Sequence, residues 1–484
     1  MKLLLSFVFG LCKCNVFKCD KDEEFYQDMN TYRLCIRLRN HCTSKIKRHI
    51  LEKNKIPVKS EWHYQSRTIT SNMNPEYFRF TDYDCLGFDL DNTLARYKVG
   101  AMIEMEYDIL ANYMVDYKGY SAEYLLKPLD HNFIIKGLIV DNENGNLLRI
   151  AADGTIIQAT HGTKLLTQQA IKNYYPNLRW KATDLFVENP LLTWNGPYAE
   201  KMRTLLDYYD VIASLVFARA VDSIDEGSSN LELCKIWPDL MEALHFMFTR
   251  EHFQNEKGKY FAEMKAHPEK YYYKCSVHLL KWLQDLRVSG KLLFLITGSN
   301  VDFATHTASH TLGENWKTMF DIVISYAKKP GFFTDHRPFI ALDGFKEIGA
   351  VKLQDLKPGE IYTHGNWTDL KEFLTKYYKK SNPRFLYVGD NLIQDIYTPN
   401  VYAGCETVTV CEELEAEGVY GHEKWHPDEQ FLCSTIWGSY FKCKDTGRMT
   451  NWYEIMKKYS KFFVPSLEYV ATFPVDHKFE INVC

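Results

Sequence analysis

Four short runs of apolar residues recur along the chain, each bounded by glycine or charged residues. They occupy residues 85–88, 292–296, 321–325 and 384–388. Continuous apolar runs of this length are typical of strands buried on both faces of a parallel sheet. Helical patterns precede or separate the runs, as in residues 276–286 and 370–377. Strands that alternate with helices predict an α/β fold with a doubly wound, mostly parallel sheet.

A long segment separates the first two runs. It holds about two hundred residues, far more than one crossover needs, so we expect an inserted domain. Its first part is β-rich, because Asn144-Gly145 and Asp153-Gly154 stand between apolar runs and such pairs are strong hairpin signals. From about Asn189 to His267 the pattern is helical. The expected organisation is an N-terminal extension over residues 1–80, a core from residues 81–104 and 276–484, and an α+β insertion over residues 105–275.

The bulk composition is that of an ordinary soluble globular protein. The chain has 484 residues, 46% hydrophobic and 25% charged, with a net charge of −4, so it gives no reason to expect a nucleic acid or an anionic membrane as partner. Only residues 31–67 are locally basic, with ten Lys or Arg against two Glu. We interpret this stretch as a solvated appendage, with a contact surface for an anionic partner as the alternative.

Thirteen cysteines are scattered without a regular framework. The cluster of Cys12, Cys14 and Cys19 lacks the second pair that a zinc site needs, and the pattern suits a reducing compartment, so we expect a cytoplasmic protein. Residues 3–12 form an apolar run too short to span a bilayer. This run resembles the apolar part of a secretory signal, which keeps a secretory location open as the alternative. A homo-oligomer is compatible with the sequence.

The first apolar run ends in two carboxylates, Asp89 and Asp91, followed by the hydroxyl of Thr93. In open α/β sheets, ligands bind at the carboxyl ends of the strands. One acid there can attack a phosphorus atom while the other manages a proton, and both can help to hold a divalent cation. A strand that simply stops in a polar turn is the alternative, because Asp and Asn commonly end strands.

Three further polar groups follow the other apolar runs. Thr297 leads into Gly298-Ser299-Asn300, whose hydroxyl and amide hydrogens can bind a phosphate. Lys329 follows the third run and can neutralise a phosphoryl group. Asp390, with Asp395 five residues later, supplies hard oxygen ligands for Mg²⁺. Each motif alone has a structural explanation, but all four stand at strand ends in this order, which predicts a phosphoryl-transfer site.

These motifs resemble those of the haloacid dehalogenase superfamily of phosphohydrolases. More narrowly, the chain resembles the cytosolic purine 5′-nucleotidase family, and most of all its 5′-nucleotidase domain-containing members. The narrower resemblance rests on residues 88–97, 136–141, 145–148, 161–162, 327–330, 332–333 and 387–391. It covers the chain from about residue 80 to the C-terminus, and it implies a haloacid dehalogenase-like catalytic core whose insertion is a cap that closes over the substrate.

The resemblance also implies catalytic roles. Asp89 is then the nucleophile that forms an aspartyl-phosphate, and Asp91 is the general acid for the leaving oxygen and later the base that activates water. Thr297 and Lys329 hold the phosphoryl group. Lys328 is the less favoured lysine, because Lys-Pro is the matching pair.

The resemblance to this family also implies a Mg²⁺ cofactor. The Asp89 carboxylate, the Asp91 backbone carbonyl and Asp390 would bind it, with Asp395 as an additional or outer acid. The physical argument agrees, because a dianionic phosphoryl group repels an incoming carboxylate, and a cation together with a lysine offsets that charge.

Substrate specificity is where the chain departs from the family pattern. Purine-specific relatives carry an Arg, an Asp and a His at helical spacing in the cap, and the helix we align with them, residues 239–248, presents Met241, His245 and Phe248. Thr163 follows His161-Gly162, where those relatives present an aromatic residue. The function we expect is a magnesium-dependent phosphomonoesterase, a 5′-nucleotidase that hydrolyses nucleoside monophosphates. The alternatives are a phosphatase of another small phosphometabolite and a low-activity interaction protein that retains the fold.

Overall fold

A computed structural model describes residues 76–191, 196, 198–419 and 426–481 of the chain. The basic stretch, the apolar run near the N-terminus and the first three cysteines discussed above lie outside these residues. Within the described residues, no helix is both long enough and apolar enough to cross a membrane.

The larger sheet has nine strands among the described residues, in the order β11-β10-β12-β9-β8-β2-β13-β14-β15. All strands from β12 to β15 in this order pair in parallel, and only β10 and β11 pair antiparallel, at one edge. The strands are β2 (Cys85–Phe88), β8 (Leu292–Ile296), β9 (Ile322–Ser325), β10 (Phe339–Asp343), β11 (Lys346–Val351), β12 (Ile361–His364), β13 (Phe385–Gly389), β14 (Glu406–Val410) and β15 (Phe462–Val464). The predicted mostly parallel α/β sheet is therefore confirmed.

The four predicted strands are all present. Strands β2 and β8 have the predicted bounds, whereas β9 begins one residue later than expected and β13 is shifted by one residue. Their residues are buried almost throughout, as expected for strands covered on both faces. Close packing explains why residue 87 of β2 is a glycine. A Cβ there would lie 2.2 Å from the Phe294 ring and 2.7 Å from the Tyr387 ring.

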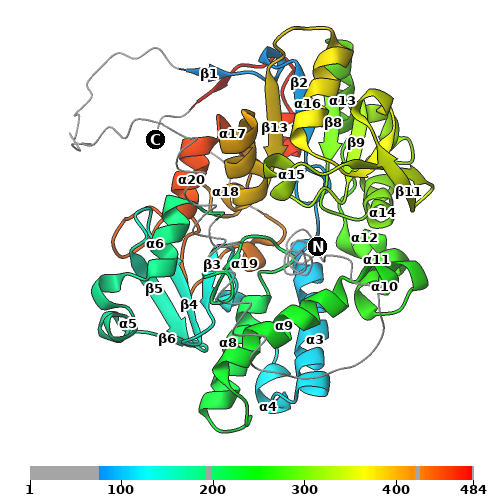
Figure 1. The fold of residues 1–484 in the computed structure, drawn as a ribbon. Coiled ribbons are helices and arrows are strands. Elements are labelled where there is room, and N and C mark those ends of the chain that lie inside the picture. Colours follow the sequence, from blue (N-terminus) through cyan, green and yellow to red (C-terminus); the bar gives the residue numbers. More distant parts are fainter. Residues whose placement is uncertain (1–75, 192–195, 197, 420–425, 482–484) are drawn as a thin grey trace, which may run out of the picture. The chain divides into compact units, whose positions relative to one another are not determined.

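Helices cover the larger sheet (Figure 1). The predicted helices over residues 276–286 and 370–377 are observed, and the side chains of Ser276 and Asn366 cap their first turns. Helix α13 (Val277–Val288) precedes β8. The helices after β8 are α14 (Val301–Leu312), α15 (Gly331–Thr334), α16 (Trp367–Tyr378), α17 (Thr398–Ala403), α18 (Glu413–Ala416), α19 (Glu429–Leu432), α20 (Asn451–Tyr459) and α21 (Leu467–Val470).

A second, antiparallel sheet lies in the chain segment between β2 and β8. Its order among the described strands is β6-β5-β4-β3-β7. The strands are β3 (Leu138–Asp141), β4 (Asn146–Ile150), β5 (Ile156–His161), β6 (Lys164–Leu165) and β7 (Met202–Leu205). The expected hairpins at Asn144-Gly145 and Asp153-Gly154 are confirmed, since β3 pairs with β4 and β4 pairs with β5. Gly145 and Gly154 have positive φ, as tight turns of this kind require.

Strand β7 was not expected, because the sequence around it was interpreted as helical. Its four residues pair antiparallel with β3, and Arg203 and Thr204 are buried beside Met202 and Leu205. A strand this short, with neighbouring polar residues both buried, has no alternating pattern that a sequence could reveal. The interpretation of residues 189–267 as helical throughout is therefore wrong for this strand.

Helices accompany the second sheet, as expected for an α+β segment (Figure 1). They are α3 (Val99–Lys118), α4 (Ala122–Leu125), α5 (Gln168–Tyr174), α6 (Lys181–Glu188), α8 (Ala213–Asp225), α9 (Leu233–Met247), α10 (Arg250–Asn255), α11 (Lys259–Ala266) and α12 (Pro268–Tyr271). The hydrophobic core of this segment also takes in C-terminal residues, among them Trp437, Trp452 and Met456. The end of the chain therefore packs with both the larger sheet and the insertion.

A small two-stranded ladder joins the two ends of the described chain. Strand β1 (Tyr77–Phe78) pairs antiparallel with β16 (Phe479–Glu480). Residues 76–80, which we expected to belong to the N-terminal extension, thus include a strand, and Phe78 and Phe80 pack in the core of the larger sheet.

Candidate active site

The order of the strands brings the four predicted motifs to one edge of the larger sheet. Strands β9, β8, β2 and β13 are neighbours and run parallel, so the residues after them meet at their carboxyl ends. The chain moves from β2 to β8 and β9 on one side and returns to β13 on the other side. Such a switch in direction creates the crevice in which open α/β sheets bind ligands.

Three carboxylates converge at this edge. Asp89, Asp390 and Asp395 each offer an oxygen, and these oxygens lie within 4.8 Å of one another. The three side chains are buried, with at most 7% of Asp390 exposed. Thr93, from the same loop as Asp89, donates a hydrogen bond to Asp390 at 3.3 Å. A buried set of carboxylate oxygens is the donor set that hard divalent cations such as Mg²⁺ prefer.

Lys329 supplies the positive charge among these acids. Its Nζ lies 3.0 Å from Asp89 Oδ1 and 2.5 Å from Asp395 Oδ1, and the lysine is fully buried. It also donates to the hydroxyl of Tyr387 at 3.2 Å. Lys328 points elsewhere, with its Nζ over the Tyr326 ring at 4.7 Å. Of the two neighbouring lysines, the structure thus brings Lys329 to the carboxylates.

Asp91 has a different environment from Asp89, although only one residue separates them. Three hydroxyl groups donate to its carboxylate: Tyr97 to Oδ1 at 2.9 Å, Ser299 to Oδ2 at 2.7 Å and Thr297 to Oδ2 at 3.2 Å. Asp91 is completely buried, so these three donors fix its orientation. Thr297 therefore contacts Asp91 directly, in addition to its position at the end of β8.

Tyr97 is a site residue to which the sequence gave no role, and Ser299, whose loop was expected to bind a phosphate, donates its hydroxyl hydrogen to Asp91 in the structure. Both stood inside the motifs that were singled out, but a hydroxyl in a loop carries no signal of the direction in which it points. The signal that pointed to Ser299 was its place in the loop after β8, two residues from Thr297, but its contact with Asp91 was not predictable.

The segment after β13 explains the spacing of Asp390 and Asp395. Residues Leu392–Tyr397 form a π-helix, η6, and the side chain of Asn391 caps it by accepting from the backbone N–H groups of Ile393 and Gln394. Asp395 accepts a hydrogen bond from the Asn391 backbone N–H at 3.2 Å. Its side chain lies against Gly389, where a Cβ would be only 2.4 Å from the Asp395 Cβ. The glycine before Asp390 thus lets Asp395 approach the strand end, and π-helical turns are frequent at functional sites.

A buried ion pair connects the segment before β3 to helix α18. Lys136, just before β3, lies 3.0 Å from Glu413 in α18, and both are almost fully buried. Tyr208 donates to Glu413 at 3.0 Å and its ring faces the Lys136 ammonium at 4.1 Å. Burial lowers the pKa of Lys136, but Glu413, Cys411 and Asp390 together outweigh burial and hold that pKa above its usual range. Lys136 begins one of the motifs that carry the family resemblance, residues 136–141, but nothing in the sequence indicates its partner.

The turn at His161-Gly162-Thr163 lies beside α8. His161 contacts Asp225 of that helix at 2.8 Å, and Thr163 donates to Asp222 at 2.6 Å. Asp222 also fits closely to Gly162, where a Cβ would lie 2.0 Å from its Oδ1. The structure therefore presents two carboxylates of α8 to this turn.

The helix aligned with the nucleotide-gripping helix of the relatives is α9. Of the residues singled out there, Met241 is half-buried against the core, His245 is exposed and Phe248 is buried. Phe248 packs edge to face against Tyr209 at 5.8 Å between ring centroids. The structure thus brings none of these three residues into the polar turn around Thr163.

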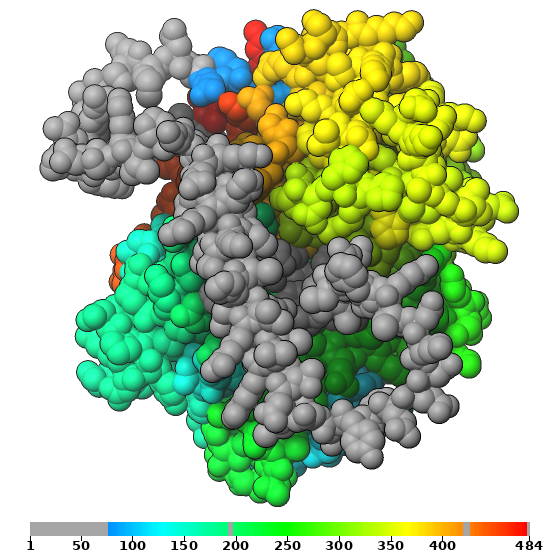
Figure 2. Space-filling view, in the orientation of Figure 1, coloured from blue at the N-terminus to red at the C-terminus, as the bar shows by residue number. Residues whose placement is uncertain are grey.

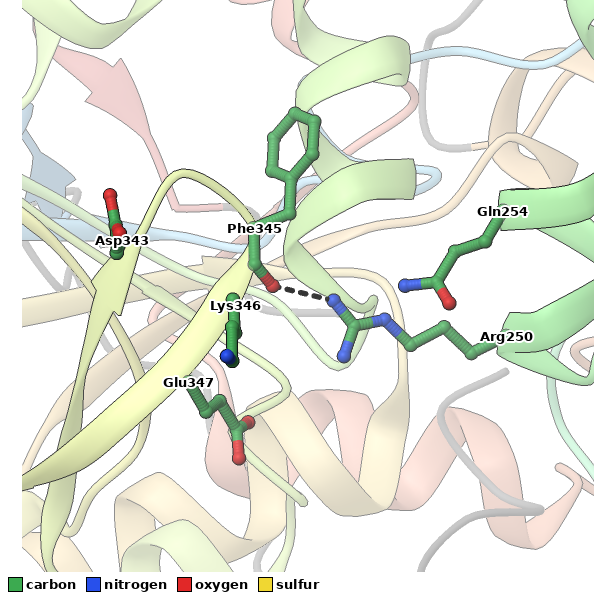
Figure 3. Close-up of a pocket in the computed structure, with 6 residues that line it drawn as sticks. All are labelled: Arg250, Gln254, Asp343, Phe345, Lys346 and Glu347. Atoms are coloured by element: carbon green, nitrogen blue, oxygen red, sulfur yellow. Dashed lines mark hydrogen bonds between the residues drawn. The ribbon is translucent and has the colours of Figure 1, made fainter.

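A surface cavity of about 410 Å³ lies apart from the predicted site residues. It is lined by Arg250, Gln254, Asp343, Phe345, Lys346 and Glu347 (Figure 3). Arg250 of α10 donates to the Phe345 carbonyl and to Asp302 of α14, both at 2.9 Å, so α10 and the β10–β11 hairpin adjoin on the face shown in Figure 2. None of the residues predicted to act on a phosphoryl group lines this cavity.

Comparisons with known proteins agree with this architecture. A model of the 5′ nucleotidase family matches residues 76–431, and the chain belongs to this family. The membership confirms the predicted class of enzyme, a phosphoric monoester hydrolase.

Particular relatives extend the match over most of the chain. The chain is similar to 5′-nucleotidase domain-containing protein 1 of Homo sapiens, with 33% identity over 433 residues, which is 84% of this chain and 93% of the human protein. The protein of the same name from Bos taurus is 32% identical over 428 residues, again 84% of this chain and 93% of that protein. 5′-Nucleotidase domain-containing protein 2 of Rattus norvegicus is 27% identical over 343 residues, 70% of this chain and 58% of the rat protein. The expected resemblance to 5′-nucleotidase domain-containing proteins is thus confirmed.

Proposed function

We propose that this protein is a magnesium-dependent phosphomonoesterase that works through an aspartyl-phosphate intermediate. The observation that carries the proposal is the convergence of Asp89, Asp390, Asp395 and Lys329 at one strand edge, with Asp91 oriented by three hydroxyls beside them. In this proposal the larger sheet and its helices are a haloacid dehalogenase-like core, from residues 81–104 and 276–484. Residues 105–275 are the inserted cap.

Two chemical steps follow from the roles of the two acids. In the first, an Asp89 oxygen attacks the phosphorus, the bond to the leaving oxygen breaks, and Asp91 gives its proton to that oxygen. In the second, Asp91 takes a proton from water, the water oxygen attacks the phosphorus, and the Asp89–phosphorus bond breaks. Lys329 and Thr297 bind the phosphoryl oxygens in both steps, so that the dianion can approach a carboxylate.

The residues present fit Mg²⁺. Asp89, Asp390 and the backbone carbonyl of Asp91 would hold it, with Asp395 as a further acid, and every donor is an oxygen. When bound, the ion supplies positive charge that offsets the charge of the phosphoryl group. Lys329 carries one positive charge but lies beside two carboxylates, those of Asp89 and Asp395. A bound cation would therefore balance the remaining negative charge of this site.

We propose nucleoside monophosphates as substrates. The support is the membership of the 5′ nucleotidase family and the names of the relatives. The turn at Thr163, which contacts Asp222 rather than presenting an aromatic ring, argues for a base preference different from that of purine-specific relatives. A cytoplasmic location and self-association stay predictions.

Phosphate release from a panel of nucleoside monophosphates and sugar phosphates tests the proposal. We expect release in the presence of Mg²⁺, loss of release with a chelator, and at least about a thousandfold loss in Asp89→Asn, because the nucleophile is removed. Equal release by wild type and Asp89→Asn contradicts the mechanism. A strong preference for sugar phosphates over every nucleotide would show that the protein is a phosphatase of another metabolite and not a nucleotidase. No phosphate release from any substrate would favour an interaction protein that retains the fold.

A further inference from the structure

The chain leaves the larger sheet for the insertion between β2 and β8, and returns from it, through two stretches that run side by side. Residues 96–98 lead into α3, and residues 272–276 follow α12 (Figure 1). The two stretches form an antiparallel bridge between Tyr97 and Tyr272. Backbone hydrogen bonds of 2.8 and 3.0 Å flank this bridge. We call these paired residues the hinge, because a movement of the insertion relative to the sheet must bend them.

Tyr97 connects the hinge to the proposed proton donor. It is buried, and its hydroxyl donates a hydrogen bond to Asp91 Oδ1 at 2.9 Å. Burial, together with the Asp91 carboxylate, raises the pKa of Tyr97 well above its usual range, so the hydroxyl keeps its proton. The other two hydroxyls that donate to Asp91, those of Thr297 and Ser299, bind Oδ2 and come from the loop after β8. Of these three donors, only Tyr97 belongs to the hinge.

A loop of the insertion, residues 207–209, contacts the catalytic loop at two points. Tyr209 packs edge to face against the Tyr97 ring, at 5.6 Å between ring centroids, and the two hydroxyls interact. Asp207 accepts a hydrogen bond from the side chain of Asn92, at 3.2 Å from its Oδ1. A change in the position of this loop would therefore reach the catalytic loop on both sides of the hydroxyl residue at position 93.

The hydrogen bond from Tyr97 favours one of the two proton transfers proposed for Asp91. In the first step Asp91 gives its proton to the leaving oxygen and becomes a carboxylate. A donor that already points at Asp91 stabilises this carboxylate as it forms, because hydrogen bonds to ionised groups are stronger than those between neutral groups. In the second step Asp91 takes up a proton, and the same hydrogen bond gives no such advantage. A correctly held Tyr97 hydroxyl thus supports Asp91 as an acid.

We propose that Tyr97 is a positioning residue that couples the proton donor to the cap, so that Asp91 donates its proton efficiently only while residues 207–209 hold the Tyr97 ring in place. The inference rests on the proposed function and concerns the regulation of that same site. A cap that moves away from the sheet takes the Tyr209 contact with it. The ester bond is therefore cleaved while the cap encloses the substrate, and cleavage slows when the cap is open.

Two phosphomonoesters that differ in their need for a proton test this role of Tyr97, with the full chain and Mg²⁺. The first is the ester that wild type hydrolyses fastest in the panel of nucleoside monophosphates and sugar phosphates, whose leaving groups are alcohols that need a proton. The second is 4-nitrophenyl phosphate, whose leaving phenolate is stable without one. The comparison uses kcat/KM, because this value covers the steps through the breaking of the ester bond and excludes the later hydrolysis of the aspartyl-phosphate.

We expect Tyr97→Phe to lower kcat/KM for the alcohol ester at least about tenfold, because a hydrogen bond to the developing carboxylate is lost. For 4-nitrophenyl phosphate, kcat/KM is expected to stay within about threefold of wild type. The ratio of the two values therefore falls. A variant that merely folded less well would lower both values together and leave the ratio unchanged.

Tyr209→Phe tests the connection to the cap, because it leaves the contact between Tyr97 and Asp91 in place. It is expected to lower the same ratio by at least about threefold, and to have no further effect on the ratio in a Tyr97→Phe background, since residues that act through one another are not additive.

Tyr175→Phe is the matched control for both variants. Tyr175 is also buried, and its hydroxyl also donates to a carboxylate, that of Asp141, but both residues belong to the insertion. This variant should keep the wild-type ratio. Circular dichroism checks that every variant is folded.

The outcomes separate this inference from the proposed function. An unchanged ratio in Tyr97→Phe, with both esters still hydrolysed, overturns the role of Tyr97, and so does an equal loss of kcat/KM with both esters. A wild-type ratio in Tyr209→Phe, or an additive effect in the double variant, overturns the coupling to the cap. No phosphate release from either ester by wild type overturns the proposed phosphatase, and the coupling with it.

Discussion

At the residue scale, the contrast between Lys329 and Lys328 is the sharpest feature of the site. The two lysines are adjacent in sequence, yet one is fully buried against Asp89 and Asp395 and the other lies over the Tyr326 ring. Lys328 is therefore a matched control for Lys329, because the same substitution can be made at two adjacent positions that differ in their contact with Asp89 and Asp395.

We expect Lys329→Met to lower kcat/KM by about a hundredfold to a thousandfold, the range for losing one charged group that stabilises a transition state. Lys328→Met should change kcat/KM by no more than about threefold. Phosphate release at fixed Mg²⁺ measures both values, and circular dichroism checks that each variant is folded. Equal losses of kcat/KM in the two variants would contradict the proposed role of Lys329, because the effect would then not depend on contact with Asp89.

At the scale of a single element, η6 determines whether Asp395 can reach the other acids. The close approach of Asp395 to Gly389 leaves no room for a side chain there, since a Cβ would lie 2.4 Å from the Asp395 Cβ. We expect Gly389→Ala to push Asp395 away and to raise the Mg²⁺ concentration for half-maximal activity at least about tenfold, because part of the carboxylate set is misplaced. Titration of activity with Mg²⁺ measures this value. An unchanged Mg²⁺ requirement would remove Asp395 from the proposed cation site.

The elements also show how far the sequence could predict the fold. Strands β2 and β8 have the predicted bounds, because each is a continuous apolar run between polar residues. The turn at Asn144-Gly145 was predictable for an equally local reason. Strand β7 was not, because Arg203 and Thr204 are buried by tertiary contacts that no local pattern shows. Edge strand β11, mostly exposed, was likewise not among the predicted strands.

The residues of the candidate site also divide into those that the sequence could predict and those that it could not. Asp89, Thr297, Lys329 and Asp390 could be singled out because each follows a buried strand, and parallel strands bring their carboxyl ends together. The contacts that orient Asp91 could not be predicted, because they depend on which way Tyr97 and Ser299 point after folding.

At the scale of the whole molecule, buried ion pairs join segments that are distant in sequence. Glu412, after β14, accepts from Arg96 of the catalytic loop region at 2.8 Å and lies 3.1 Å from His426. Burial favours a raised pKa, but Arg96 and His426 outweigh it and lower the pKa of Glu412 to about 2. The ionised form of Glu412 is thus stabilised by the fold.

This shift predicts a pH dependence of stability. A carboxyl whose pKa falls from 4.5 to about 2 on folding contributes about 3 kcal/mol above pH 4.5, and this is lost as the pH falls from 4.5 towards 2. In denaturant unfolding, Glu412→Gln should be less stable than wild type at pH 7, and the difference should shrink as the pH falls to 3. A difference that is constant from pH 7 to pH 3 would show that Glu412 is not paired in solution.

The central claim is that Asp89 becomes covalently phosphorylated during turnover. The most direct measurement is to quench the enzyme during hydrolysis of a nucleoside monophosphate, reduce it with borohydride and analyse the peptide around residue 89 by mass spectrometry. An acyl phosphate is reduced to the alcohol, so the account predicts a homoserine at position 89 in wild type and none in Asp89→Asn or without substrate. Active enzyme that yields an unmodified Asp89 under every quench condition would contradict the account.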